Sequence, residues 1–193
     1  MLTLVWDVDD VLNDLMYQWL ERCWKVEHRN CHVGYSDLSE NPPHRLLEAS
    51  REQYLASLDG FRRSEAGRQL TPDPDLLLWF QNNGARFRHI ALTARPLETG
   101  PEAAAWVMQH FGAWIRTFGI VPTRAHECVP IYDYGKGDYL RWLGKGDVLI
   151  DDTLENLSQA EGLGIRGIAW PQPWNGANQL KAKILDRLSD LRG

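Results

Sequence analysis

The segment Leu2-Thr-Leu-Val-Trp6 runs directly into Asp7-Val-Asp9-Asp10 near the start of the sequence. A short, nearly continuous apolar run of this kind is typical of a strand buried on both faces of a sheet. Because acidic residues follow without a spacer, the expected strand ends in a group of carboxylates. This arrangement predicts both a fold class and the position of a polar site.

Two later apolar runs end in the same manner. His89-Ile-Ala-Leu-Thr93 ends in a hydroxyl group, and Val148-Leu-Ile150 is followed at once by Asp151-Asp152. Further strands are expected at Phe118–Val121, Cys128–Tyr132 and Ile165–Trp170. The helical spacing of apolar residues, together with proline and glycine positions, predicts the intervening helices. These are expected over residues 12–27, 46–58, 72–83, 101–111, 137–143, 153–163 and 176–191.

Strands that alternate with helices predict an α/β fold with a parallel sheet covered on both faces. In such three-layer, Rossmann-like folds, ligands bind beyond the carboxyl ends of the strands. We therefore expect Asp7, Asp9, Thr93, Asp151 and Asp152 to converge at one edge of the sheet.

Residues 14–70 stand apart from this alternation. Apolar residues recur there at helical spacing, Gly60 and Gly67 interrupt the pattern, and no part has the alternation of a strand. We expect residues 14–70 to form a helical insertion, while residues 1–13 and 71–193 form the α/β core.

The composition is that of an ordinary globular protein. Of the 193 residues, 44% are hydrophobic and 24% are charged, which argues against disorder and low-complexity architecture. The formal net charge of −5 argues against a protein that binds duplex nucleic acid. The first residues lack the pattern of an export signal, and no apolar run reaches the length of a membrane helix. The spacing of the three cysteines matches no zinc-binding pattern, so we expect reduced thiols. Together these features predict a cytoplasmic protein that is not associated with a membrane.

The aspartates that follow the strands have the chemistry of a magnesium site. Asp7 and Asp9 lie two residues apart, so an extended backbone places both carboxylates on one side. With Asp151 and Asp152 they offer several hard oxygen ligands, which suit Mg²⁺. Crowded carboxylates repel one another unless a cation lies among them. The sequence therefore predicts Mg²⁺ as a cofactor of these four residues.

The dispersed motifs resemble those of the haloacid-dehalogenase superfamily of phosphohydrolases. Asp7-Val-Asp9-Asp10-Val11 is similar to its first motif, although the family most often has glycine where this chain has Asp10. Leu92-Thr93 resembles the second motif, Lys136 the third, and Leu149-Ile-Asp151-Asp152 the fourth. The resemblance spans nearly the whole chain, and it implies that the insertion is a small helical cap of the C1 type.

A narrower likeness concerns the end of the chain. Ile150-Asp-Asp152, followed by Pro173-Trp-Asn175 in a late loop, is similar to the cytosolic 5′(3′)-deoxyribonucleotidase group. This likeness implies a small phosphorylated metabolite as the partner, with (deoxy)nucleoside monophosphates as the first substrate class. A phosphatase for sugar phosphates or other small metabolites is the alternative. A second alternative is a non-catalytic protein that binds phosphate or a partner.

The family resemblance implies a role for each motif residue. Asp7 would be the nucleophile that forms an aspartyl-phosphate, and Asp9 the acid and base, with its main-chain carbonyl on the metal. The presence of Asp9 favours the phosphatase branch, because the dehalogenase branch lacks this second acid. Asp151 would bind Mg²⁺ directly, and Asp152 directly or through water.

Phosphate binding would fall to Thr93, through a hydrogen bond, and to Lys136, through its charge. Lys145, just before the last acidic strand, competes with Lys136 for this role. We prefer Lys136 because Gly137-Asp-Tyr-Leu140 follows it as a helix start.

Several other residues allow two interpretations. Arg95 follows Thr93 closely and either binds the phosphate or lies in a surface turn. Asn13 and Asp14 either face the substrate or cap a helix. Four aromatic residues could stack on a nucleobase, although packing inside the insertion is the simpler role for most of them. They are Trp19, Trp24, Tyr35 and Tyr54.

Overall fold

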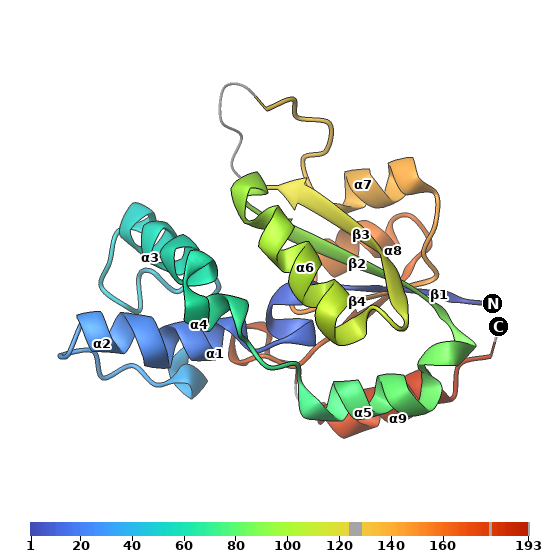
Figure 1. The fold of residues 1–193 in the computed structure, drawn as a ribbon, viewed down its shortest axis with the longest axis horizontal. Helices are drawn as coiled ribbons and strands as arrows, with labels where there is room; N and C mark the ends of the chain where they lie inside the picture. The colour runs from blue at the N-terminus through green and yellow to red at the C-terminus, as the bar shows by residue number, and fades with distance from the viewer. Residues whose placement is uncertain (124–128, 178, 193) are drawn as a thin grey trace.

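The computed structural model describes residues 1–123, 129–177 and 179–192. In this part of the chain, five parallel strands form one sheet in the order β3-β2-β1-β4-β5 (Figure 1). The strands are β1 (Thr3–Trp6), β2 (Arg88–Arg95), β3 (Ile115–Pro122), β4 (Val148–Asp151) and β5 (Arg166–Ala169). The α/β fold predicted from the alternation of strands and helices is therefore confirmed.

The central position of β1 brings the motif-bearing strands together. Trp6, the last residue of β1, is in register with Ala91 of β2 and Ile150 of β4. The amide of Asp7 continues the ladder by donating to the carbonyl of Ile150, at 2.9 Å. All strands run parallel, so the polar ends of β1, β2 and β4 reach the same edge of the sheet.

Helices cover both faces of the sheet, and β1 packs against both layers. Leu4 and Trp6 belong to a large apolar core with residues of α5, α6 and α9. Val5 points the other way and packs with residues of α7 and α8. These helices are α5 (Pro74–Asn83), α6 (Gly100–Phe111), α7 (Lys136–Leu143), α8 (Leu154–Glu161) and α9 (Lys181–Ser189). The sheet is thus the middle of three layers, which explains why its central strand β1 is apolar on both faces.

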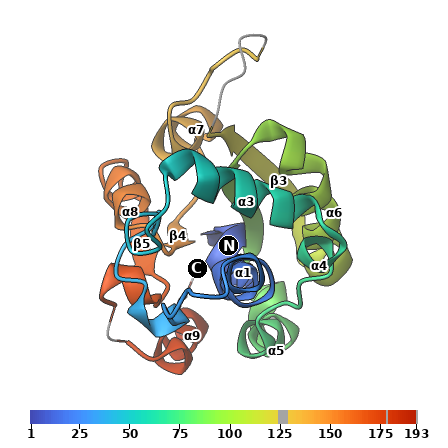
Figure 2. The ribbon, with the colours of Figure 1, turned by 90° about the vertical axis from the view of Figure 1, so that its left-hand side faces the viewer.

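A helical segment, residues 14–70, lies beyond the end of the sheet to which the strands point (Figure 1). Its helices are α1 (Leu15–Trp19), α2 (Lys25–Glu27), α3 (Arg51–Arg63) and α4 (Glu65–Arg68). A π-helical turn, Leu20–Trp24, joins α1 and α2 into one helical rod. Figure 2 views the molecule from this side, with α1, α3 and α4 in front of the core.

The apolar residues of the helical segment continue the large core of the sheet. Trp19 is fully buried, contacts the rings of Trp24 and Tyr54, and donates its indole N–H to Ser57 at 3.1 Å. The same apolar core contains Leu4 and Trp6 of the central strand. The segment is therefore joined to the sheet by continuous packing near the polar ends of the strands.

Several expected elements differ from the structure; the last helix begins at Lys181 and not at residue 176, and the second helix ends at Arg63 and not at residue 58. The second helix begins at Arg51, not near residue 46, because Glu48 has a left-handed φ of 53° and Ser50 caps the helix. The strand expected at Cys128–Tyr132 is wrong for 129–132, which form no strand, while Cys128 lies outside the described residues. The other expected strands are confirmed, and β2 and β3 are longer than the apolar runs indicate.

No helix in the described part of the chain combines the length and apolar character needed to cross a membrane. Among the cysteines of those ranges, Cys23 and Cys31 are both free thiols.

Candidate active site at the strand ends

Three of the predicted metal ligands form one compact group. Asp7, Asp151 and Asp152 each place a carboxylate oxygen within 4.8 Å of the others, and all three side chains are buried. Asp7 follows β1, Asp151 ends β4, and Asp152 comes directly after it. The group therefore lies where neighbouring strands end, as the sequence predicts.

The turn after β1 explains how Asp10 fits a position where the motif that this segment resembles most often has glycine. Asp10 has a left-handed φ of 61°, a conformation that aspartate tolerates better than most residues. Its Oδ1 accepts a hydrogen bond from the amide of Met16 at 2.8 Å, which satisfies the start of α1. Asn13 Oδ1 accepts from the amides of Asp10 and Leu15, so the capping interpretation holds for Asn13. Asp14 makes no such cap; its Oδ2 accepts from Gln18 instead.

Lys136 lies between the carboxylates of Asp7 and Asp151. Its Nζ is 2.7 Å from Asp7 Oδ1 and 2.6 Å from Asp151 Oδ2, and only 1% of its side chain is exposed. Burial alone would lower the pKa of Lys136, but the charges of Asp151 and Asp7 outweigh burial and raise it. Lys136 is therefore a fixed positive charge, whereas the competitor Lys145 is exposed.

The two acids at the end of β4 are held by Thr153 and Asn156, which the motif analysis did not single out, and by the late loop that it quoted. Asp151 Oδ1 accepts from the amide of Thr153 at 2.8 Å and from Asn156 Nδ2 at 3.1 Å. Asp152 Oδ2 accepts from the indole N–H of Trp174 at 2.8 Å, and Asn175 Nδ2 donates to the Asp152 carbonyl at 2.9 Å. Trp174 and Asn175 come from the late Pro173-Trp-Asn175 loop, so this loop supports the site directly.

The charge balance of the group suits a divalent cation. Burial, and then the nearby carboxylates, raise the pKa of Asp152. Burial likewise raises the pKa of Asp7, against the lowering effect of Lys136. One ammonium group faces three buried carboxylates, so negative charge is in excess where hard oxygen donors gather. The residues therefore fit Mg²⁺, with Asp7, Asp151 and Asp152 as the side chains that could hold it.

Asp9 is turned away from this group and toward two arginines. Its Oδ2 is 2.9 Å from Nη2 of Arg62, which belongs to α3, and its Oδ1 pairs with Nη2 of Arg95. Burial would raise the pKa of Asp9, but the charges of Arg95 and Arg62 together hold it below its usual value. The carboxylate of Asp9 thus lies outside the three-acid group, and the role of its main-chain carbonyl stays a prediction.

Arg95 also connects Asp9 to Thr93. Its Nε donates to Thr93 Oγ1 at 3.2 Å, and both side chains are buried at the end of β2. Arg95 is therefore no surface residue of a turn. The pairing of Asp9 with Arg62 was missed by sequence reasoning, because 53 residues separate the partners and no local motif relates them.

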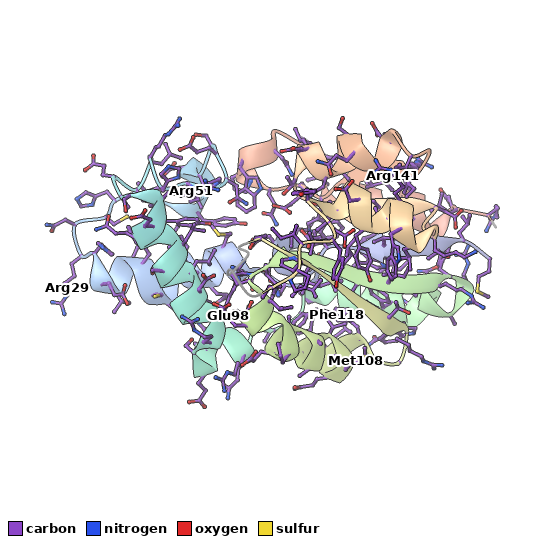
Figure 3. The ribbon with its side chains drawn as sticks, turned by 90° about the horizontal axis from the view of Figure 1, so that it is seen from above. Arg29, Arg51, Glu98, Met108, Phe118 and Arg141 are labelled. Atoms are coloured by element: carbon purple, nitrogen blue, oxygen red, sulfur yellow. The ribbon has the colours of Figure 1, made fainter. Side chains whose placement is uncertain are left out.

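All the predicted site residues except the fully buried Asp151 border one cavity of about 240 Å³ between the sheet and the helical segment. From the core, it is lined by Asp7, Asp9, Asp10, Thr93, Ala94, Thr123, Lys136, Asp152, Thr153 and Asn156. From residues 14–70, it is lined by Leu15, Met16, Asn41, Pro42, Arg51, Tyr54, Leu55, Leu58 and Arg62. Arg51, labelled in Figure 3, is exposed and lies at the start of α3. The cavity therefore has an acidic floor and a mixed apolar and basic wall.

The aromatic residues of the helical segment offer little open surface to this cavity. Trp19 and Trp24 are buried and contact each other, and neither lines the cavity. Tyr35 contacts Trp174 edge-on and donates its hydroxyl to Gln172. Only Tyr54 among the four lines the cavity, and 3% of this residue is exposed. Packing is therefore the role that the structure gives Trp19 and Trp24.

No protein-family model matches the chain, and a search of curated protein sequences finds no match. Solved structures do match. A haloacid-dehalogenase-like hydrolase from Streptococcus pneumoniae aligns with a TM-score of 0.61 at 12% identity, over 98% of this chain and 92% of that chain. A subfamily IA hydrolase of the same superfamily from Geobacter sulfurreducens aligns with a TM-score of 0.54 at 14% identity, over 97% and 96%.

A third match is the hydrolase YfnB from Bacillus subtilis, whose structure is described as bound to magnesium and as revealing interdomain movement. It aligns with a TM-score of 0.55 at 12% identity, over 98% of this chain and 99% of that chain. The structural neighbours are thus hydrolases of the haloacid-dehalogenase superfamily, and the chain shares their Rossmann-like fold.

Proposed function

We propose that the chain is a Mg²⁺-dependent phosphomonoesterase that acts through an aspartyl-phosphate on Asp7, with residues 14–70 as its cap. One observation carries the proposal. The buried carboxylate of Asp7 lies beside Lys136 and two further acids, on the floor of a cavity that Asp9 and Thr93 also line. A nucleophile, a proton carrier and phosphate-binding groups therefore surround one space.

Asp7 is held in an orientation that leaves one oxygen to attack. Its Oδ1 accepts from the amide of Val8 at 2.7 Å and contacts Lys136 Nζ, whereas no described residue donates to Oδ2. Oδ2 attacks phosphorus, the bond between phosphorus and the ester oxygen breaks, and Asp9 in its protonated form, which Arg95 and Arg62 keep a minor population by lowering its pKa, gives a proton to the departing alkoxide. The products of this first step are the free alcohol and phosphorylated Asp7.

Hydrolysis of the aspartyl-phosphate reverses the role of Asp9. Its carboxylate takes a proton from a water molecule as the water oxygen attacks phosphorus. The bond between phosphorus and Asp7 Oδ2 then breaks, which releases inorganic phosphate and restores the Asp7 carboxylate. Each proton given in the first step is thus recovered in the second.

Thr93 and Lys136 stabilise the transferred group. The hydroxyl oxygen of Thr93 already accepts from Arg95 Nε, so its own hydrogen is available to a phosphoryl oxygen. Lys136 places its charge beside Asp7, where negative charge develops. Mg²⁺, when held by Asp7, Asp151 and Asp152, supplies Lewis-acid charge that offsets the repulsion between the nucleophile and the phosphate.

Two substrate classes remain to be separated. Nucleoside monophosphates are favoured by the likeness of Ile150-Asp-Asp152 and Pro173-Trp-Asn175 to the deoxyribonucleotidase group. Small sugar phosphates are favoured by the cavity, because its 240 Å³ lies below the usual range for ligand pockets, about 300–1,000 Å³. The burial of Trp19 and Trp24 also removes two candidate surfaces for stacking a base.

The test begins with p-nitrophenyl phosphate, with Mg²⁺ and with EDTA. We expect metal-dependent release of p-nitrophenolate, and a loss of about 10³-fold or more in Asp7→Asn. Asp138→Asn is the matched control, since Asp138 lies on α7 and pairs only with groups at the surface. A panel of nucleoside monophosphates and sugar phosphates then distinguishes the substrate classes. Absence of turnover by the unmodified protein with every ester would favour the non-catalytic alternative.

A further inference from the structure

Asp9 forms ion pairs with two arginines that belong to different parts of the chain. Arg95 comes from the end of β2, in the core, and contacts Oδ1 of Asp9. Arg62 comes from α3 and contacts Oδ2 at 2.9 Å. The helix α3 lies across the side of the molecule turned toward the viewer in Figure 2. The proton carrier of the proposed reaction is therefore a point of contact between the helical segment and the core.

Arg62 is itself anchored within α3. Its Nη1 lies 3.0 Å from Asp59 Oδ1, one helical turn earlier, and only 12% of the Arg62 side chain is exposed. The neighbouring Arg63 differs sharply, since half of its side chain is exposed and it pairs with Glu98 across 3.7 Å. Arg62 is thus a buried, fixed guanidinium directed at Asp9, and Arg63 is a surface arginine on the same helix.

Two contacts on two oxygens define the plane of a carboxylate, whereas one contact leaves it free to rotate. Arg95 holds Oδ1 of Asp9 and Arg62 supplies the restraint at Oδ2, in addition to a side-chain hydrogen bond from Asn13. Proton transfer depends on orientation, and a misplacement of about 1 Å can reduce the rate about 10²-fold. We propose that Arg62 is a positioning residue that fixes the Asp9 carboxylate at the cavity and so makes proton transfer by Asp9 depend on the docking of α3. This inference rests on the proposed phosphatase function.

A different role for Arg62 is direct contact with the substrate phosphate. Arg62 lines the cavity, and its buried Nε has no hydrogen-bond partner in the described part of the chain. The two roles have different kinetic consequences. Loss of a phosphate contact weakens every phosphate ester alike, whereas loss of Asp9 orientation affects esters according to how much their leaving group needs a proton.

The experiment compares Arg62→Gln, Arg62→Lys and the surface control Arg63→Gln on two esters. In p-nitrophenyl phosphate the leaving group is stable as an anion, whereas glycerol 1-phosphate must release an alcohol. We expect Arg62→Gln to lower kcat for glycerol 1-phosphate about 10–100-fold more than for p-nitrophenyl phosphate, with KM little changed. Arg62→Lys should retain part of the kcat for glycerol 1-phosphate that Arg62→Gln loses. Arg63→Gln should have the kcat of the unmodified protein on both esters.

Equal losses on the two esters, or a change confined to KM, would overturn the inference and favour direct phosphate contact or a purely structural role. Thermal unfolding of each variant establishes that the fold is retained, and Arg62→Lys carries the same comparison if Arg62→Gln does not fold. If the proposed function is wrong, the unmodified protein hydrolyses neither ester, and the inference about Arg62 is wrong with it. If only the inference is wrong, the unmodified protein hydrolyses the esters and the Arg62 variants show no difference between them.

Discussion

The indole N–H of Trp174 donates a hydrogen bond to Oδ2 of Asp152 at 2.8 Å. Trp174 lies in the loop that follows β5, and its ring contacts Tyr35 of the helical segment edge-on, with 6.0 Å between ring centroids. Next to it, Gln172 accepts from the Tyr35 hydroxyl and donates to the carbonyl of Asp10. The late loop therefore links the helical segment to two acids of the candidate site.

Trp174→Phe should weaken the binding of a divalent cation while preserving the ring contact. Hydrogen bonds to a metal ligand orient it, and their removal typically costs about 10–100-fold in metal affinity. Calorimetric titration with Mg²⁺ or Mn²⁺ measures the change without any substrate. Trp142→Phe is the control, because Trp142 is exposed on α7. Equal affinities for the two variants would mean that Trp174 does not position Asp152.

Replacement of Lys136 by methionine should affect stability and activity together. Without its ammonium group, the carboxylates of Asp7 and Asp151 lose their ion-pair partner inside the core, a change that costs about 3–5 kcal/mol in comparable buried pairs. The free energy of unfolding, measured with urea in EDTA, should fall by this order. Addition of Mg²⁺ should recover part of the loss, because a cation at the three acids again balances their charge.

The control for this prediction is Lys145→Met, which changes an exposed lysine close to the same strand. It should leave the unfolding free energy and the proposed phosphatase activity nearly unchanged. A loss of activity in Lys145→Met with little change in Lys136→Met would instead assign the phosphate lysine to Lys145.

The strands of the core could be predicted because the signal is local. Each apolar run before Asp7, before Asp151 and up to Thr93 forms the body of one strand, and a polar residue lies at its carboxyl end. Parallel packing then brings these ends together without further information. Lys136 could be found in the same way, since a short helix begins at it and the fold places that helix beside β4.

The contacts that complete the site could not be predicted, because they join residues far apart in the chain. Arg62 reaches Asp9 across 53 residues and Trp174 reaches Asp152 across 22, and neither partner belongs to a shared local pattern. One missed feature did have a local signal. Ser50 and Gln53 form a capping box, which marks the start of α3 at Arg51 better than the apolar spacing does.

Asp10→Asn and Asp10→Ala should differ in stability although both remove the same charge. Burial and the charges of Asp9 and Asp7 raise the pKa of Asp10, so the folded protein tolerates loss of its negative charge. Asparagine accepts the left-handed backbone and can still accept from the Met16 amide, whereas alanine does neither well. We expect Asp10→Ala to unfold with about 1–3 kcal/mol less free energy than Asp10→Asn in urea. Equal stability would show that neither the cap nor the backbone conformation matters there.

His89 should make the stability of the protein depend on pH. Its Nδ1 accepts from the Trp6 indole at 3.0 Å, so its Nε2 carries the proton and donates to the Gly84 carbonyl at 2.8 Å. Burial lowers the pKa of His89 below the ordinary 6.5, against the smaller effect of Gly84. As pH falls below about 6.5, the unfolded chain therefore binds a proton at His89 more readily than the folded chain does, and the free energy of unfolding declines.

The measurement is urea unfolding between pH 7.5 and 5.5 for the unmodified protein and His89→Gln. Glutamine offers an acceptor and a donor but does not titrate, so it removes the proton-linked part of the stability alone. The stability advantage of the unmodified protein should shrink toward low pH, by no more than about 1.4 kcal/mol per pH unit. His32→Gln, at an exposed position, should show a constant difference. Because the carboxylates titrate equally in all three proteins, a pH-independent difference for His89→Gln would mean that His89 is not held neutral.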